Sequence, residues 1–124
     1  MVISDLLLTM FRFEELRVYQ DALILVDYIY SLTKEWPKDE LFGLTNQIRR
    51  AVVSIVLNVA EGSSRTKKDF RHFLDLAKGS CYEVAAILTI AKNRKYIDEI
   101  EYRKHYEFCI KLAKMLSALK KSLL

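Results

Sequence analysis

The chain has 124 residues, with 52% hydrophobic and 29% charged side chains and a formal net charge of +4. The apolar content excludes a disordered chain, and three Gly and one Pro are too few for the many turns of a β-sandwich or barrel. No apolar run is long enough to cross a membrane, so we expect a single all-α domain without a membrane partner.

The start of the chain and the cysteine count bear on location and domain boundaries. Residues 2–11 are apolar but few, carry Asp5 and follow no basic leader, so we do not expect a signal peptide. Two Cys give no disulfide framework, which predicts a reducing, cytoplasmic environment. We expect an N-terminal extension over residues 1–12 and one helical domain over residues 13–124.

Two amphipathic helices are predicted in the first half of the chain. The first covers about residues 13–35 and ends before Pro37, since the residue before a proline avoids helical backbone angles. The second covers about residues 40–62, with Asp39 as its N-cap and Gly62 as its terminator. Their expected core positions recur three and four residues apart, at Leu16, Tyr19, Leu23, Val26 and Tyr30 and at Leu44, Ile48, Val52, Ile55 and Val59.

Both helices carry a second set of apolar residues beside these core positions. A helix that is apolar most of the way round is buried on more than one side. We expect the extra residues to meet another subunit or the N-terminal segment, and scattered surface apolar residues are the alternative. The extra residues are Leu25, Ile29 and Leu32 in the first helix and Val53, Val56 and Leu57 in the second.

Two further helices are predicted in the second half. Thr66 and Asp69 have capping-box spacing with the shorter acid, and Asp98 and Glu101 have the full pattern. Four helices joined by short links predict an antiparallel up-down-up-down four-helix bundle. The core positions of the last two are Phe70, Leu74, Ala77, Cys81, Val84, Leu88 and Ala91, then Tyr102, His105, Cys109, Leu112, Leu116, Leu119 and Leu123.

Signatures of catalysis and metal binding are missing from the sequence. It has no Gly-rich phosphate loop, no nucleophile elbow and no His-Glu-x-x-His motif. Cys81 and Cys109 are expected level in the last helical hairpin, but His72 and His105 fall on other layers, so no Cys/His zinc cluster is expected there. We expect two core thiols and a noncatalytic protein with no metal, no cofactor and no small-molecule substrate.

A line of polar side chains crosses the otherwise apolar second helix. We expect Gly79 and Ser80 to let the third helix approach closely, and Glu83 to pair with Arg50. The line is then a buried polar network that fixes helix register, or a face that contacts a ligand or nucleic acid. Its members share one face because they are spaced three or four residues apart: Gln47, Arg50, Ser54, Asn58 and Glu61.

A basic cluster lies at the start of the third helix, comprising Arg65, Lys67, Lys68 and Arg71. Free backbone N–H groups already make that helix end positive, so helix stability does not explain cations there, whereas phosphate contacts do. Charge is also uneven, with −4 on the first forty residues and +6 on the next fifty-five. This asymmetry fits a polyanionic partner or head-to-tail self-association, and a solvated charged face is the alternative.

Three groups of residues form a further pattern: Phe13-x-x-Leu16-x-Val18-Tyr19-Gln20; Gln47-Ile48-Arg49-Arg50-Ala51 with Ser54-Ile55 and Asn58-Val59-Ala60-Glu61-Gly62-Ser63; and Phe73-Leu74-x-Leu76-Ala77-x-Gly79-Ser80-x-x-Glu83. The pattern resembles a bacterial four-helix bundle family whose members include proteins encoded in intervening sequences of the 23S rRNA gene. Many members have Pro where this chain has Val56, so a straighter second helix is expected. Members usually begin near the first group, which makes Met10 a candidate start.

This family is similar to the accessory protein of diversity-generating retroelements, a ring-forming helical bundle that binds nucleic acid beside a reverse transcriptase. The resemblance therefore implies a homo-oligomer, a pentameric ring, and RNA or DNA as a partner. With the basic cluster as phosphate contacts, we expect noncatalytic nucleic-acid binding. The alternative is a protein-interaction scaffold that binds no nucleic acid.

Overall fold

The computed structural model describes residues 11–124. Three predictions concern residues outside this range: the absence of a signal peptide, the candidate start at Met10 and most of the expected extension over residues 1–12. Within residues 11–124, no helix is long and apolar enough to cross a membrane. The elements are η1 (Arg12–Glu15), α2 (Arg17–Thr33), η2 (Lys38–Glu40), α3 (Leu44–Ser63), α4 (Lys67–Asn93) and α5 (Glu99–Ser122), where η marks a short 3-10 helix.

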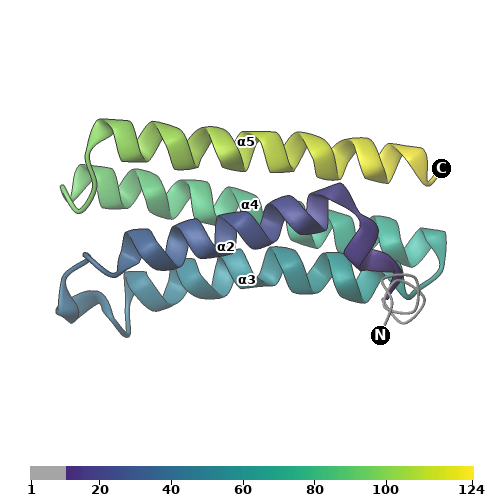
Figure 1. Ribbon diagram of the computed structural model, residues 1–124, viewed down its shortest axis with the longest axis horizontal. Helices are drawn as coiled ribbons and strands as arrows, with labels where there is room; N and C mark the ends of the chain where they lie inside the picture. Colours follow the sequence, from purple (N-terminus) through teal and green to yellow (C-terminus); the bar gives the residue numbers. More distant parts are fainter. Residues whose placement is uncertain (1–10) are drawn as a thin grey trace, which may run out of the picture.

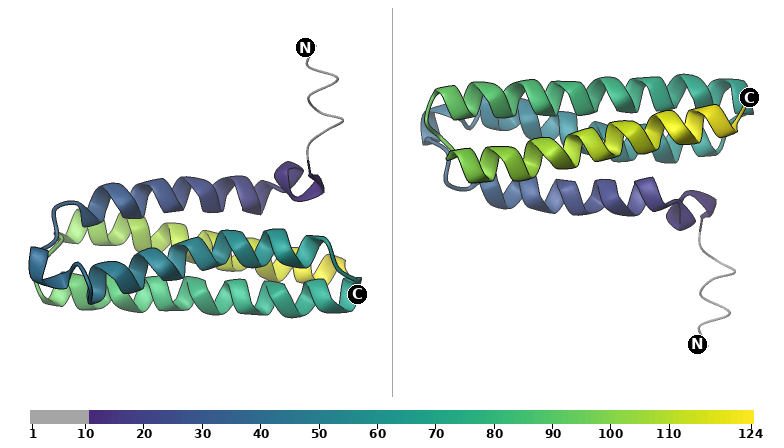
Figure 2. Two further views of the ribbon diagram at one scale, coloured as in Figure 1. Left: turned by 90° about the horizontal axis from the view of Figure 1, so that it is seen from below. Right: turned by 90° about the horizontal axis from the view of Figure 1, so that it is seen from above.

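The four long helices form one antiparallel bundle (Figure 1). Each packs against the next, and α2 also contacts α5, which closes the bundle. The predicted all-α, up-down-up-down four-helix bundle is thus confirmed. η1 and the last turn of α5 lie at the same end as the α3–α4 turn, here named the α3–α4 end, and the other two connections lie at the opposite end (Figure 2).

One hydrophobic core runs along the bundle axis. All of the expected core positions of α4 are buried, because the alternating three- and four-residue spacing keeps them on a single helix face. α3 is continuous through Val56. The expected core residues of α3 and α5 that are buried are Ile48, Val52, Ile55 and Val59, then His105, Cys109, Leu112 and Leu116.

The predicted core face of α2 is wrong. Leu23 and Tyr30, expected in the core, are exposed, and Leu16, Tyr19 and Val26 are half-buried. Both faces of α2 are apolar, so periodicity does not say which one turns toward the other helices. Packing against α3 and α5 selects the face that carries Val18, Ala22, Leu25, Ile29 and Leu32.

Polar and aromatic contacts join α2 to α5. The side chain of Asp21 is buried, and its Oδ2 lies 3.4 Å from Nζ of Lys111 and 3.9 Å from Nε of Arg17. Tyr28 of α2 packs edge-on against His105, with ring centroids 6.0 Å apart. A buried carboxylate is therefore held against a cation across this helix pair.

The predicted capping box of α5 is confirmed, whereas at α4 only the half formed by the Thr66 side chain is present. Thr66 Oγ1 accepts the backbone N–H of Asp69 at 3.2 Å. Asp98 and Glu101 form a complete capping box, in which Asp98 Oδ1 accepts the N–H of Glu101 at 2.7 Å. These side chains satisfy backbone donors that a helix start leaves free.

The predicted caps of α3 are wrong at both ends, although α3 ends at Ser63, next to the predicted end at Gly62. Asp39 lies in η2 instead of capping α3, which begins at Leu44, and the N–H of Leu44 donates to Oε1 of Glu40 at 3.3 Å. Gly62 does not terminate α3, because it is buried within the helix and its φ is not positive. A Cβ at Gly62 would lie 2.6 Å from Cβ of Phe73, so glycine serves a close approach between α3 and α4.

Candidate nucleic-acid interface

The predicted basic cluster lies at the α3–α4 end. Lys67 and Lys68 form the first turn of α4, and both side chains are exposed. Neither has a carboxylate within 4.0 Å among residues 11–124. Arg65, in the preceding turn, pairs with Glu61 and lies over the ring of Phe73 at 5.4 Å. Two ammonium groups are thus left for an external anion.

Arg71 has a different place from the rest of the cluster. It is half-buried, and its Nη1 donates to the backbone carbonyl of Leu123 at 3.1 Å. This bond ties the end of α5 to the first turns of α4. Arg71 therefore contributes to packing of the bundle end, and a phosphate contact would compete with that role.

The fold adds cations that the sequence cluster did not include. Arg12 of η1 and Lys121 of α5 lie at the same end of the bundle and are exposed. Lys120 is paired with Asp75, with Nζ 2.9 Å from a carboxylate oxygen. The predicted cluster does not include these residues because it comprises only neighbours along the chain, although the predicted antiparallel topology brings the end of α5 beside the start of α4.

A hollow of about 230 Å³ lies among these cations and is named the end hollow. It is framed by η1, the α3–α4 turn, the start of α4 and the end of α5. The arrangement can hold a group that is both anionic and apolar. Its lining combines Arg12, Arg65 and Lys67 with Ser63 and with the apolar side chains of Leu16, Phe70, Leu119 and Leu123.

The predicted polar line on α3 is only partly buried. Asn58 Nδ2 donates to the backbone carbonyl and to Oγ of Ser54, at 2.8 and 2.9 Å, and Ser80 Oγ donates to Ser54 Oγ at 3.0 Å. The bond between Ser80 and Ser54 joins α4 to α3, whereas the two bonds of Asn58 lie within α3. Gln47 and Glu61 are exposed, so the line as a whole is not a buried network. It follows the outer edge of the α3–α4 contact.

Two details predicted for this contact are wrong. Arg50 and Glu83 line one groove of about 320 Å³ between α3 and α4, but no carboxylate oxygen of Glu83 is within 4.0 Å of the Arg50 guanidinium. Both are exposed, and an exposed ion pair contributes little to stability. Gly79 is exposed and a Cβ there meets nothing within 4 Å, so close approach occurs at Gly62 instead.

Comparison with known proteins shows the family of this chain. Residues 14–118 match the family described as 23S rRNA-intervening sequence protein. The chain belongs to this family. A crystal structure of a protein of unknown function from the S23 ribosomal protein family of Bacteroides thetaiotaomicron has the same fold, with a TM-score of 0.78 and 24% identity over 84% of this chain and 98% of that one. No curated protein matches the sequence. The family resemblance predicted from the three groups of residues is confirmed.

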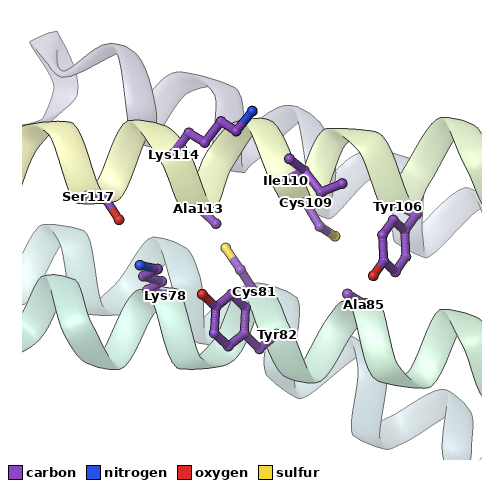
Figure 3. A pocket seen from close by; sticks show the side chains of 10 residues that line it. All are labelled: Lys78, Cys81, Tyr82, Ala85, Tyr106, Cys109, Ile110, Ala113, Lys114 and Ser117. Carbon is purple, nitrogen blue, oxygen red and sulfur yellow. The ribbon is translucent and has the colours of Figure 1, made fainter.

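The two cysteines of the chain line an apolar groove of about 410 Å³ between α4 and α5 (Figure 3). Burial raises the pKa of Cys81 to about 12, and burial together with the neighbouring Cys81 raises the pKa of Cys109 to about 12. Both thiols therefore stay protonated at neutral pH, and a protonated thiol is a poor nucleophile and metal ligand. They are core thiols, as predicted.

The two histidines lie on different helices and differ in burial. His72 is exposed, whereas His105 is buried with Nδ1 2.6 Å from the backbone carbonyl of Glu101. Within residues 11–124, no three His, Cys, Asp or Glu side chains are grouped so that they could hold a metal ion.

Proposed function

We propose that this protein is a noncatalytic homo-oligomer that binds nucleic acid through the basic surface at the α3–α4 end. The observation that carries the proposal is the exposed pair Lys67 and Lys68, without a carboxylate partner in the described part of the chain. They begin a 27-residue helix, where backbone N–H groups add positive potential. A bound phosphate group offsets the cost of concentrating positive charge there.

The convergence of further cations supports the same ligand. Arg12 and Arg65 line the end hollow together with Lys67, and Lys121 belongs to the last turn of α5 at the same end of the bundle. Phosphates recur regularly along a nucleic acid, so several such contacts form at once. Contacts with phosphates carry little sequence information and release counterions. Binding is therefore expected to depend weakly on sequence and strongly on salt.

A charge reversal with a matched control tests this proposal. Lys67→Glu/Lys68→Glu is compared with Lys34→Glu/Lys38→Glu at the opposite end, where both lysines are also exposed and unpaired among the described residues. Each double variant lowers the net charge by four, from +4 to zero. Fluorescence anisotropy with labelled RNA and DNA, at about 50 mM salt and above, measures affinity and its salt slope.

The first double variant is expected to weaken binding and to flatten the salt slope by about one to two units, since two phosphate contacts are lost. The control is expected to change the slope much less. Unchanged helix content and oligomer mass exclude misfolding as the cause. Equal losses of affinity in both double variants would show that net charge alone, and not the α3–α4 end, determines binding, which would contradict the proposed interface. Absence of binding by the wild type at about 50 mM salt would refute the proposal.

Exposed apolar residues support self-association. On α2, Leu23 and Tyr30 are exposed. On α3, Leu57 is 60% exposed, although Val53 is half-buried and Val56 is buried. Apolar residues that recur along two adjacent helices are typical of a surface that meets another subunit. The family resemblance implies a ring of five subunits.

Light scattering tests the assembly. The wild type is expected to have a mass of about five times 14.5 kDa at micromolar concentration. Leu57→Glu is expected to lower that mass, whereas Ile100→Glu, which changes a residue that is 80% exposed at the start of α5, is not. A monomeric wild type, or an equal effect of both variants, would contradict self-association through α2 and α3.

The apolar groove between α4 and α5 favours a second candidate function, a protein-interaction scaffold without nucleic-acid binding. Tyr82 and Ile110 are exposed beside the groove, and Ala85 and Ala113 leave room between the helices. Grooves of this kind accept apolar side chains of a partner helix. Absence of binding to both RNA and DNA, together with loss of a protein complex on Ile110→Glu, would favour this function over the first.

A further inference from the structure

The end hollow has the size and lining for one ring system. Its volume of about 230 Å³ lies below the roughly 300–1,000 Å³ of sites for drug-sized ligands. Phe70 is buried and Leu16, Leu119 and Leu123 are half-buried, so much of the wall is apolar. A planar, largely apolar ring fits such a wall better than a hydrated ion does, because the ring loses less hydration on entering.

Charge complementarity identifies what the ring must carry. Arg12, Arg65 and Lys67 line the end hollow, and within residues 11–124 no Asp or Glu does. Arg12 and Lys67 have no carboxylate within 4.0 Å in the described part of the chain. Cations beside an apolar wall suit a ring attached to an anionic group, which is the chemistry of a nucleotide.

An exposed aromatic residue directly precedes one of these cations in the chain. Phe11 directly precedes Arg12 and is 70% exposed, and its ring stacks on that of Phe13, with centroids 5.6 Å apart and an interplanar angle of 13°. Exposed aromatic rings among cations are typical of surfaces that bind single-stranded nucleic acid, since unpaired bases stack on the rings while phosphates meet the cations.

We propose that the end hollow holds one unpaired nucleobase and that Phe11 stacks a neighbouring base, so that the protein prefers single-stranded nucleic acid to duplex. This inference rests on the proposed function and specifies its ligand. In a duplex the bases are paired and stacked inside, so only phosphates reach Lys67 and Lys68. A single strand makes the same phosphate contacts and inserts a base as well.

The first measurement compares single strands with duplexes of equal length and mixed sequence by fluorescence anisotropy of the full chain at matched salt. The wild type is expected to bind the single strand at least about tenfold more tightly, as the loss of one base stack implies. Equal affinities, or tighter binding of the duplex, would overturn the inference while leaving nucleic-acid binding in place. Absence of binding to both would overturn the proposed function itself.

A filled hollow tests where the base is held. Leu123→Trp places a large ring in the end hollow, whereas Leu124→Trp makes the same change one residue later, where the side chain is 87% exposed and does not line the hollow. Leu123 follows the last residue of α5, and its bond with Arg71 uses the backbone carbonyl, which the substitution keeps. Leu123→Trp is expected to reduce single-strand affinity toward that of the duplex, and Leu124→Trp is not.

A second pair of variants tests the stacking. Phe11→Ala is compared with Phe42→Ala, which removes a ring that is 92% exposed near the opposite end of the bundle. Phe11→Ala is expected to weaken single-strand binding about tenfold and to leave duplex binding unchanged. Phe42→Ala is expected to change neither. An equal loss for single strand and duplex in Phe11→Ala, or unchanged single-strand affinity in both Phe11→Ala and Leu123→Trp, would refute the inference.

Discussion

Gly62 and Gly79 both lie within long helices, but a methyl group added to each would meet different surroundings. At Gly62 the new Cβ would lie 2.6 Å from Cβ of Phe73 and 2.9 Å from Cδ1 of Phe70. At Gly79 it would meet nothing within 4 Å. The same substitution, Gly→Ala, therefore tests the close approach of α3 and α4, with the gain in helix propensity as a common background.

The two substitutions are expected to change the free energy of unfolding in opposite directions. Alanine favours a helix over glycine by about 0.5–1 kcal/mol, so Gly79→Ala should stabilise by about that amount. Gly62→Ala gains less, since Gly62 is next to the last residue of α3, and it overpacks the contact with Phe73. Overpacking costs about 1–3 kcal/mol. Because Cβ of Phe73 moves only with the backbone of α4, we expect a net loss of about 1–2 kcal/mol.

Urea unfolding followed by far-UV circular dichroism measures both variants at equal protein concentration, which matters if subunits associate. The two free energies of unfolding are expected to differ by about 1.5–3 kcal/mol, with Gly62→Ala the less stable. Gly62→Ala as stable as Gly79→Ala would refute the close approach. Gly79→Ala less stable than the wild type would instead show that the space around Gly79 is occupied by another subunit or ligand.

Three further predictions concern stability. Asp98→Ala removes the capping box of α5 and is expected to lower the urea midpoint by an amount equivalent to about 1 kcal/mol; an unchanged midpoint would contradict the role of the cap. Lys111→Met leaves the buried carboxylate of Asp21 without its nearer cation, and thermal and urea unfolding should show a loss of about 1–3 kcal/mol. Because burial raises the pKa of Cys81 and Cys109 from 9.0 to about 12, both thiols favour the folded state below pH 9.0, and this contribution declines as the pH rises toward 12. Above pH 9.0 the wild type should lose up to about 1.4 kcal/mol per pH unit and per thiol more than Cys81→Ala/Cys109→Ala, and parallel pH profiles would contradict this.

Features that depend on neighbours within a few residues could be predicted from the sequence. The caps at Thr66 and Asp98 are confirmed because a side chain three residues from a backbone N–H needs only local geometry to reach it. The core face of α4 is confirmed because that helix has one apolar face, so its periodicity allows one orientation. The all-α bundle follows from the same local patterns and from short links.

Features that depend on contacts between distant segments could not be predicted in this way. α2 is apolar on two faces, and only its packing against α3 and α5 selects Leu25 and Ile29 over Leu23 and Tyr30 for the core. Glycine is common at helix ends, but Gly62 lies inside α3, where Phe70 and Phe73 of α4 leave no room for a Cβ. Sequence pattern shows that a small residue is present and does not show what approaches it.

The candidate site likewise combines residues that the sequence predicts with residues that only the tertiary structure brings together. Lys67 and Lys68 were found from the sequence, because cations at a helix start conflict with the local backbone potential. The tertiary structure alone binds Arg71 to the end of α5 and brings Arg12, which follows Phe11 in the chain, to the hollow that Lys67 also lines. The physical reason is that helix starts, caps and single-faced helices depend on interactions within one or two turns, whereas a hollow at a bundle end is formed by the chain segments that packing brings there.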